Sequence, residues 1–365
     1  MVLDASVVAT NVLLTGLFLF LFLLTSEIFN STIDEHRAEV EGWFTRLVRG
    51  PLRFLAPLAR ADAAVDHLAE SGRGGAILHT VAVLAVLGVV YGLLSADFGL
   101  NEQTLVLIVS LMVGLGLLTY LNFGGKSLIV RRRYRTRSVV RLYGTAVIVA
   151  AACVLVSRFV DFHPGFVYGF VASMVILAPV ALTKRDEARI VALPAMALLV
   201  VSLAAWLLLG PVRAAAAEGG SLGSTLLESI LGVVFLGGLE GLLFSLLPIR
   251  YLDGAKILAW SRPAWVLLYG VVVFLWWQLL LNRDAAYVDA LKQPSVQAVF
   301  GVLLVWGITT GCMWTYFRIR DRGRSEEEVE EAEEEAEEEQ DEPTEAVTDP
   351  DDLDGIEHPE PPEAD

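Results

Sequence analysis

The sequence is poor in the residues that build metal centres and disulfide frameworks. Its 365 residues include two cysteines and five histidines. Cys153 and Cys312 lie far apart inside apolar runs, so they indicate neither a disulfide framework nor a metal site. No two histidines are four residues apart and none precedes a glutamate, which excludes a His-Glu-x-x-His zinc helix. Phosphate-binding P-loops and Gly-x-Ser-x-Gly elbows are also absent. We therefore expect no cofactor, no metal and no nucleic-acid partner.

Basic residues are missing from the end of the chain. Residues 325–365 hold 22 Asp and Glu and no Lys or Arg, so all 27 basic residues lie before them. The net charge of −16 thus divides into an acidic tail and a basic body. The tail has few large apolar residues to offset chain entropy, so we expect disorder, with a first part that becomes helical at low pH or when bound. It is either a solvating tail or an electrostatic partner for a basic protein or for the chain's own basic loops.

Hydrophobic residues are abundant, at 55% of the sequence, with a mean hydropathy of +0.58. A water-soluble chain of this length could not cover so much apolar surface. Since about 20 apolar residues in a helix span the hydrocarbon core, the runs predict an all-α polytopic transmembrane bundle of about nine helices. The runs lie at 5–25, 76–95, 104–122, 143–157, 165–182, 190–210, 226–248, 264–281 and 296–317.

Lysine and arginine gather in alternate connections between these runs. The connections at 26–75, 123–142 and 183–189 each hold three or more basic residues, most of them arginine, whereas those at 96–103 and 211–225 hold one or none. Positively charged loops stay in the cytoplasm. The alternation predicts an outside N-terminus and a cytoplasmic C-terminus in the cell (inner) membrane. High use of Ala, Val, Arg and Gly indicates a prokaryotic source.

The predicted organisation has four parts. The first part, residues 1–25, holds the run at 5–25, which follows Asp4 and is too long for a signal peptide, so it predicts a retained helix. A cytoplasmic amphipathic segment at 26–75 follows, and then an eight-helix bundle at 76–317. A basic junction and the acidic tail occupy 318–365.

The cytoplasmic segment contains the stretch EVEGWFTRLVRGPLRFLAPLAR. Trp43 lies on an apolar stripe of helical spacing, and Arg46, Arg49 and Arg53 are interleaved with it. This pattern is typical of a helix lying in the interface of an anionic leaflet, where these four residues contact lipid. The alternative is a helix packed beneath the transmembrane bundle.

Glu240 is the clearest ionisable residue at membrane depth. It precedes Pro248 by eight residues, which places it about 12 Å below the end of its helix. Gly237 and Gly241 flank it at a spacing that lets a second helix approach closely. Glu240 is either a structural residue in a tight helix contact or a proton or ligand site. Glu228 lies near the outer end of the same run and is interfacial.

The stretch LLPIRYLDGAKI, residues 246–257, places Arg250, Asp253 and Lys256 between two apolar runs. It resembles the second metal motif of site-2-protease-type intramembrane metalloproteases, in which Leu-Asp-Gly follows a proline-containing approach. The resemblance covers about a dozen residues and implies that Asp253 takes the position of a zinc ligand near the cytoplasmic face. The histidine helix of that family is missing here. The alternative is a cytoplasmic turn in which Asp253 caps a helix or pairs with Arg250 or Lys256.

Three functions are compatible with these features. The leading hypothesis is a non-enzymatic scaffold or regulator that acts through its cytoplasmic loops and tail. The second is a transporter or channel that uses Glu240. The third is a catalytically incomplete site-2-protease-like membrane protein.

Overall fold

The computed structural model describes most of the chain. The described residues are 4–37, 39, 40, 42, 73–93, 95, 98, 99, 101–136, 138–142, 151, 154, 172–176, 182–219, 221–282 and 284–341. The chain divides into two units, residues 1–314 and 315–365.

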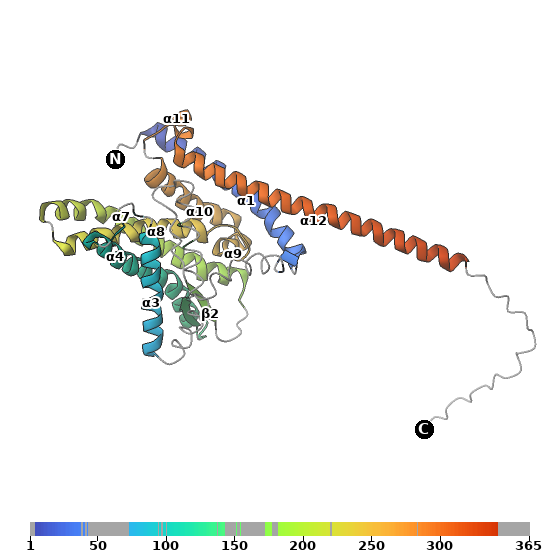
Figure 1. Cartoon of the computed structure of the whole chain (residues 1–365), viewed down its shortest axis with the longest axis horizontal. Coiled ribbons are helices and arrows are strands. Elements are labelled where there is room, and N and C mark those ends of the chain that lie inside the picture. Colours follow the sequence, from blue (N-terminus) through green and yellow to red (C-terminus); the bar gives the residue numbers. More distant parts are fainter. Residues whose placement is uncertain are drawn as a thin grey trace, which may run out of the picture. The chain divides into compact units, whose positions relative to one another are not determined.

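Helices dominate the described chain (Figure 1). Two short π-helices interrupt the α-helices, and one pair of strands is present. The elements are α1 (Ala5–Glu35), α3 (Arg73–Gly92), α4 (Glu102–Thr119), η1 (Tyr120–Gly124), α5 (Gly125–Arg133), β1 (Ser138–Leu142), β2 (Ala172–Ile176), α7 (Lys184–Gly219), α8 (Leu222–Ser245), α9 (Asp253–Trp260), α10 (Arg262–Trp276), η2 (Trp277–Leu281), α11 (Tyr287–Leu291) and α12 (Pro294–Asp341).

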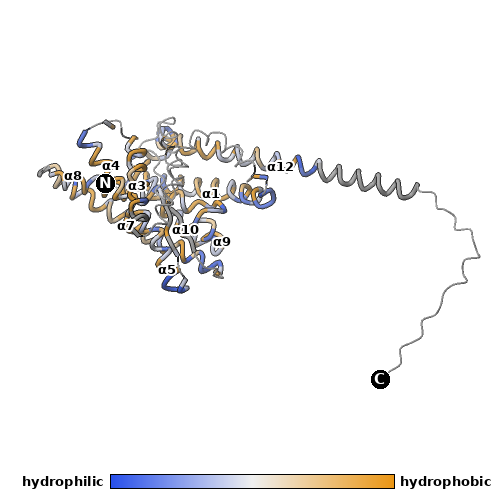
Figure 2. The backbone as a smooth tube through the Cα atoms, turned by 60° about the horizontal axis from the view of Figure 1, so that its bottom comes forward, coloured by the Kyte–Doolittle hydropathy of each residue, from blue (hydrophilic) through white to orange (hydrophobic). Residues whose placement is uncertain are grey.

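Six of the described helical segments are long and apolar enough to cross a membrane, and Leu78–Gly92 forms a shorter apolar helix. Figure 2 shows hydrophobic residues along most of their length and hydrophilic residues at the end of α5. Large apolar side chains also point outward, as Phe20 of α1 and Leu304 of α12 do. An exposed apolar surface of this kind needs lipid around it. The chain is therefore a multi-pass helical membrane protein. The six segments are 5–35, 102–133, 184–217, 222–245, 262–281 and 294–323.

Polar residues fix where four of these helices begin. Asp4, Asn101, Ser221 and Ser261 precede α1, α4, α8 and α10. The side chain of each accepts a hydrogen bond from a backbone N–H two or three residues later, which satisfies one of the free donors of the first turn. The hydrogen bonds from Ser6 hold the pKa of the Asp4 carboxyl below its usual value.

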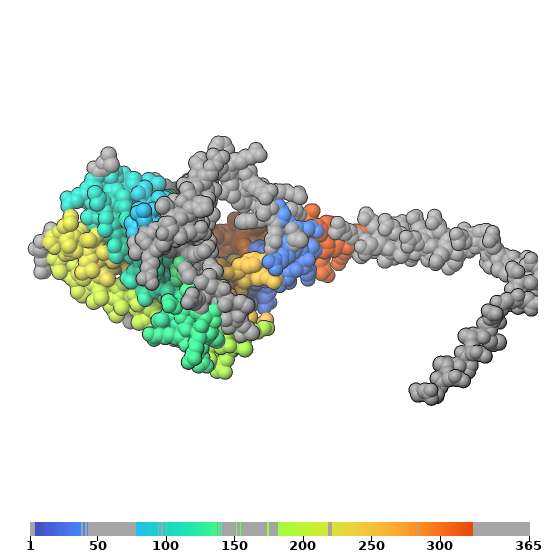
Figure 3. All heavy atoms as spheres, turned by 90° about the horizontal axis from the view of Figure 1, so that it is seen from below, coloured from blue at the N-terminus to red at the C-terminus, as the bar shows by residue number. Residues whose placement is uncertain are grey.

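Helix α8 packs against both α7 and α4, and α4 also packs against α3. Figure 3 shows the turquoise of α4 beside the yellow of α8, and the green of α5 beside the yellow-green of α7. The approach of α4 to α8 is close, because a Cβ on Gly114 would lie within 3.0 Å of the Val233 side chain. Helix α10 packs on α1, α8 and α9, and its Trp265, Tyr269 and Trp276 are buried in the main hydrophobic core.

The prediction of a helix at 165–182 is wrong for the central residues of that run. Ala172–Ile176 form β2, which pairs antiparallel with β1 so that Ser138 lies opposite Ile176. The valines of both strands and Ile176 of β2 favour this pairing. The hydrophobicity of the run was compatible with either structure, because a short apolar run does not distinguish strand from helix. The predicted helix at 143–157 lies outside the described residues, apart from Ala151 and Val154.

Helix α12 continues as one helix through Asp341. The first part of the acidic tail, residues 325–341, therefore has a helical backbone, although the composition of residues 325–365 predicts disorder. Glutamate and alanine are good helix formers, and extending an existing helix avoids the cost of nucleation. Residues 342–365 lie outside the described chain.

Candidate functional site

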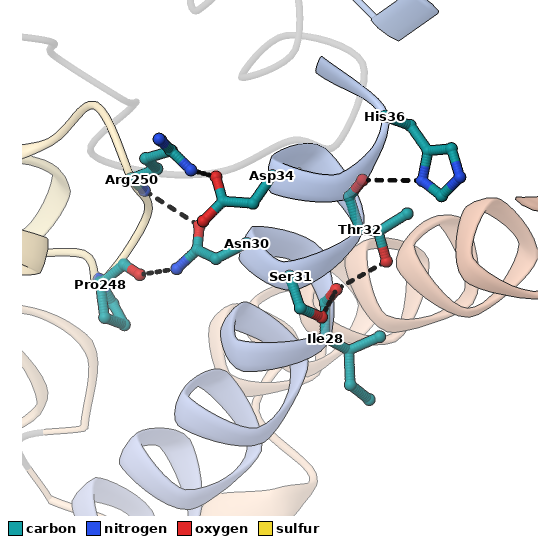
Figure 4. Close-up of polar contacts among 8 residues, drawn as sticks. All are labelled: Ile28, Asn30, Ser31, Thr32, Asp34, His36, Pro248 and Arg250. Atoms are coloured by element: carbon teal, nitrogen blue, oxygen red, sulfur yellow. Dashed lines mark hydrogen bonds and ion pairs between the residues drawn. The ribbon is translucent and has the colours of Figure 1, made fainter. Parts of the chain in front are cut away.

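The loop from Leu246 to Leu252 connects α8 to α9 and is fastened to the end of α1 (Figure 4). The Asn30 amide nitrogen donates to the Pro248 carbonyl oxygen at 2.8 Å, and its amide oxygen accepts from the Arg250 backbone N–H at 3.0 Å. The Arg250 guanidinium forms an ion pair with Asp34 of α1. These contacts fix the first half of the LLPIRYLDGAKI stretch against a helix more than 200 residues earlier in the chain.

Asp253 opens α9, and its carboxylate forms an ion pair with the Lys126 ammonium of α5. The Lys126 side chain is only 6% exposed, and its ammonium also lies 4.5 Å from the centre of the Phe123 ring. The alternative partners that we considered, Arg250 and Lys256, are therefore not the ion-pair partners of Asp253. A buried ammonium needs a counter-ion, and Asp253 supplies it.

Gly254 lets the start of α9 lie directly against the end of α8. A Cβ at this position would lie within 3.0 Å of the backbone carbonyl groups of Leu246 and Leu247. The Leu246 carbonyl oxygen also accepts a hydrogen bond of 2.9 Å from the buried Trp265 indole. Glycine is required here because any side chain would displace backbone atoms.

Glu240 lies in the interior of α8 with an exposure of 1%. The neighbouring Gly238 explains how the helices close around it. A Cβ on Gly238 would lie within 3.0 Å of the Ser202 hydroxyl of α7 and 3.2 Å from Leu118 of α4. Glu240 is therefore a buried residue of a helix that packs closely on α7 and α4 two residues away, at Gly238. Arg250 lies in the loop beyond the end of α8 and Asp253 at the start of α9, and they make the separate contacts given above.

The Leu252-Asp253-Gly254 motif is the part of the chain that resembles an intramembrane metalloprotease. In the described part of the chain, no three His, Cys, Asp or Glu side chains lie together in a way that could hold a metal ion. The Asp253 carboxylate contacts an ammonium group, which competes with any cation for the same oxygens. The interfacial residues Trp43, Arg46, Arg49 and Arg53 lie outside the described residues.

A second polar cluster was missed by the sequence analysis. The fully buried Asn11 of α1 donates to Gln278 Oε1 at 2.7 Å and to the Asn282 carbonyl oxygen at 3.0 Å. Asn282 returns a hydrogen bond to Asn11 Oδ1 at 2.7 Å. Nearby, Thr10 Oγ1 accepts from the Tyr287 backbone N–H at 2.9 Å. The available signal was the presence of amide side chains inside apolar runs, because buried polar groups in membranes must find partners within the protein.

Helix η2 carries Gln278 and ends immediately before Asn282. Isolated π-helical turns in α-helices occur frequently at functional sites. The other such turn, η1, lies immediately before α5, which carries Lys126. The Lys126–Asp253 ion pair and the amide cluster of Asn11, Gln278 and Asn282 therefore each lie next to a π-helical turn.

Comparison of the chain with protein-family models, with characterised proteins and with solved structures finds no match.

Proposed function

We propose that the chain is a non-enzymatic membrane scaffold or regulator that binds a partner through its cytoplasmic basic loops and acidic tail. The observation that supports this proposal best is that the polar groups around the Leu-Asp-Gly stretch bind other residues of the same chain. Asp253 pairs with Lys126, Arg250 pairs with Asp34, and Asn30 holds the loop backbone. Contacts of this kind stabilise one arrangement of the helices, and they leave the Asp253 carboxylate engaged by an ammonium group.

Exposed charges suited to a partner lie elsewhere. Arg131, Arg132 and Arg133 end α5 and are exposed to solvent. The acidic stretch after Arg324 supplies the opposite sign. Surfaces of this kind attract partners of complementary charge, here an acidic surface or anionic lipid for the arginines and a basic protein for the tail.

The proposed orientation places the N-terminus outside and the C-terminus in the cytoplasm of a prokaryotic inner membrane. It is supported by the charges at the helix ends, since α5 ends in three arginines and α7 begins with Lys184 and Arg185. In a variant without Cys153 and Cys312, an impermeant thiol reagent should label new cysteines at 99 and 218 from outside. Cysteines at 133 and 340 should react only from inside. Labelling of 133 from outside would contradict this orientation.

The scaffold proposal is tested by the size of the complex that leaves the native membrane in a mild detergent. We expect an assembly larger than the single chain. Replacing Arg131, Arg132 and Arg133 by glutamine, or truncating after Arg324, should release the partner while the bundle stays inserted. Lys292→Gln, at an exposed basic residue of a connection predicted to lie outside, is the control and should leave the assembly intact. A wild-type chain that migrates alone, with and without chemical cross-linking, would overturn the proposal.

A transport function makes a different prediction at Glu240. Glu240→Gln keeps the shape and the hydrogen-bonding groups of the side chain but removes its titration. A scaffold should keep its partner assembly in this variant. A transporter should lose solute or ion flux in proteoliposomes while its folding is unchanged, and this result would favour the second hypothesis.

A further inference from the structure

A cavity of about 800 Å³ lies between α7, α8 and η2, separate from the Leu-Asp-Gly stretch. Its volume lies in the range of small-molecule binding sites. Aromatic and aliphatic side chains form most of its wall, with Trp206 and Phe235 in ring contact at 6.5 Å between centroids. The polar residues of the lining are Arg213, Glu228, Ser229, Gln278 and Asp284.

The lining of the cavity includes a hydrogen-bond donor. Gln278 is 4% exposed, and its amide oxygen accepts from Asn11. That bond fixes the orientation of the amide group. The amide nitrogen makes no hydrogen bond with the described residues, although Gln278 lines the cavity. This nitrogen is not one of the buried atoms that lack a partner, so it is accessible from the cavity and can donate to an acceptor there.

Charged side chains also line the cavity. Arg213 Nε donates to Glu228 Oε1 at 2.7 Å, and the Arg213 side chain is 68% exposed, which marks the open side. This bond uses one of the five N–H donors of the guanidinium group. Asp284 adds a carboxylate to the same lining. With Arg213 and Glu228 balanced, the described lining residues carry one net negative charge.

Proline and glycine shape the rest of the wall. Pro211 lies inside α7 and has no N–H for the carbonyl group of Leu207, which lines the cavity. Gly210 and Gly232 also line the cavity, and a Cβ on either would meet no atom within 4 Å. The cavity thus exists partly because two lining positions lack side chains.

We propose that this cavity binds a zwitterionic amphiphile, a molecule with an ammonium group, an oxyanion group and an apolar body. The ammonium group matches Asp284 and Glu228. The oxyanion matches the Gln278 amide nitrogen and the remaining donors of Arg213. The apolar body lies against Trp206 and the other hydrophobic wall residues, and an ammonium group also interacts favourably with aromatic faces. This site is independent of the scaffold proposal, because it uses none of the same residues.

Two sources supply this chemistry: a phospholipid with an ethanolamine headgroup, or a free apolar amino acid. Native mass spectrometry of the full chain in detergent distinguishes them with three probes. The probes are a short-chain phosphatidylethanolamine, the phosphatidylglycerol with the same chains, and leucine. The net negative lining predicts at least tenfold tighter binding of one of the two zwitterions than of phosphatidylglycerol. Preference for phosphatidylethanolamine identifies the lipid source, and preference for leucine identifies the aqueous source.

Two variants connect the binding to the cavity. Gly232→Leu fills the lining without meeting a neighbouring atom at Cβ, and it should abolish binding. Gly301→Leu, at an equally open glycine of α12, is the matched control and should bind as the wild type does. Gln278→Glu keeps the acceptor for Asn11 but loses the donor, and it should weaken binding about tenfold. The proposal is overturned by equal affinity for all three probes, by the absence of zwitterion binding, or by undiminished binding in Gly232→Leu.

Discussion

Gly254→Ala tests whether the loop after α8 is held as tightly as its contacts indicate. The added methyl group would lie within 3.0 Å of the backbone carbonyls of Leu246 and Leu247. Backbone atoms cannot rotate away as a side chain can, so the whole loop must shift. Overpacking of this kind costs about 2 kcal/mol. The same shift lengthens the 2.9 Å hydrogen bond from Trp265 to Leu246, and losing that bond adds about 1 kcal/mol.

The expected loss is therefore about 3 kcal/mol, or more than a hundredfold in the unfolding equilibrium constant. Unfolding of the full chain in mixed detergent micelles measures it. Tryptophan fluorescence is a suitable signal, because Trp265, Trp276 and Trp277 are almost completely buried. Their emission should shift when the core opens to detergent and water.

Gly301→Ala is the matched control, because a Cβ on Gly301 meets nothing within 4 Å. Alanine in place of an exposed helical glycine should change the stability by less than about 1 kcal/mol, in the stabilising direction. If Gly254→Ala unfolds at the same detergent composition as the wild type and the control, the close packing of the loop on α8 is refuted.

Three further substitutions, two of them combined with a compensating second change, test the buried contacts by the same unfolding measurement. Gly238→Ala should destabilise less than Gly254→Ala, and Ser202→Ala should restore part of the loss because it removes the hydroxyl that the methyl group meets; no recovery would contradict the helix contact. Asp253→Asn should cost about 3 kcal/mol by leaving the buried Lys126 ammonium without a counter-ion, and Lys126→Met in addition should recover most of it. A neutral Asp253→Asn would show that the ion pair does not stabilise the fold. Asn11→Leu removes three hydrogen bonds and should cost about 2 kcal/mol at the values typical of membrane proteins, whereas an unchanged stability would argue against the buried amide cluster.

The membrane architecture could be predicted because it depends on local composition. Seven of the nine predicted helices coincide with apolar helices of the described chain. The run at 165–182 was ambiguous for a physical reason. Its apolar residues suit a buried strand as well as a helix, and the pairing of β2 with β1 depends on residues about 30 positions earlier.

The candidate site could be predicted only in part, because its contacts are long-range. Asp253 was identified from the Leu-Asp-Gly motif, and Glu240 from its position inside an apolar run. The partner of Asp253 was not predictable, since Lys126 lies 127 residues earlier in a basic segment that also contains many arginines. The amide cluster also depends on tertiary contact, because Gln278 and Asn282 acquire a partner only when α1 packs beside them.

The contacts of α1 have a consequence for biosynthesis. Its residues bond to segments that are made much later in translation: Asn11 reaches Gln278 across 267 positions, and Thr25 accepts from the Trp306 indole across 281. At about 5–20 residues per second, a ribosome needs about 15–50 s to make that intervening length. Throughout this interval α1 is in the membrane while the amide of Asn11 still lacks its final acceptors. The nascent chain must therefore keep α1 close to the insertion machinery, or satisfy that amide with temporary partners, until η2 and α12 are made.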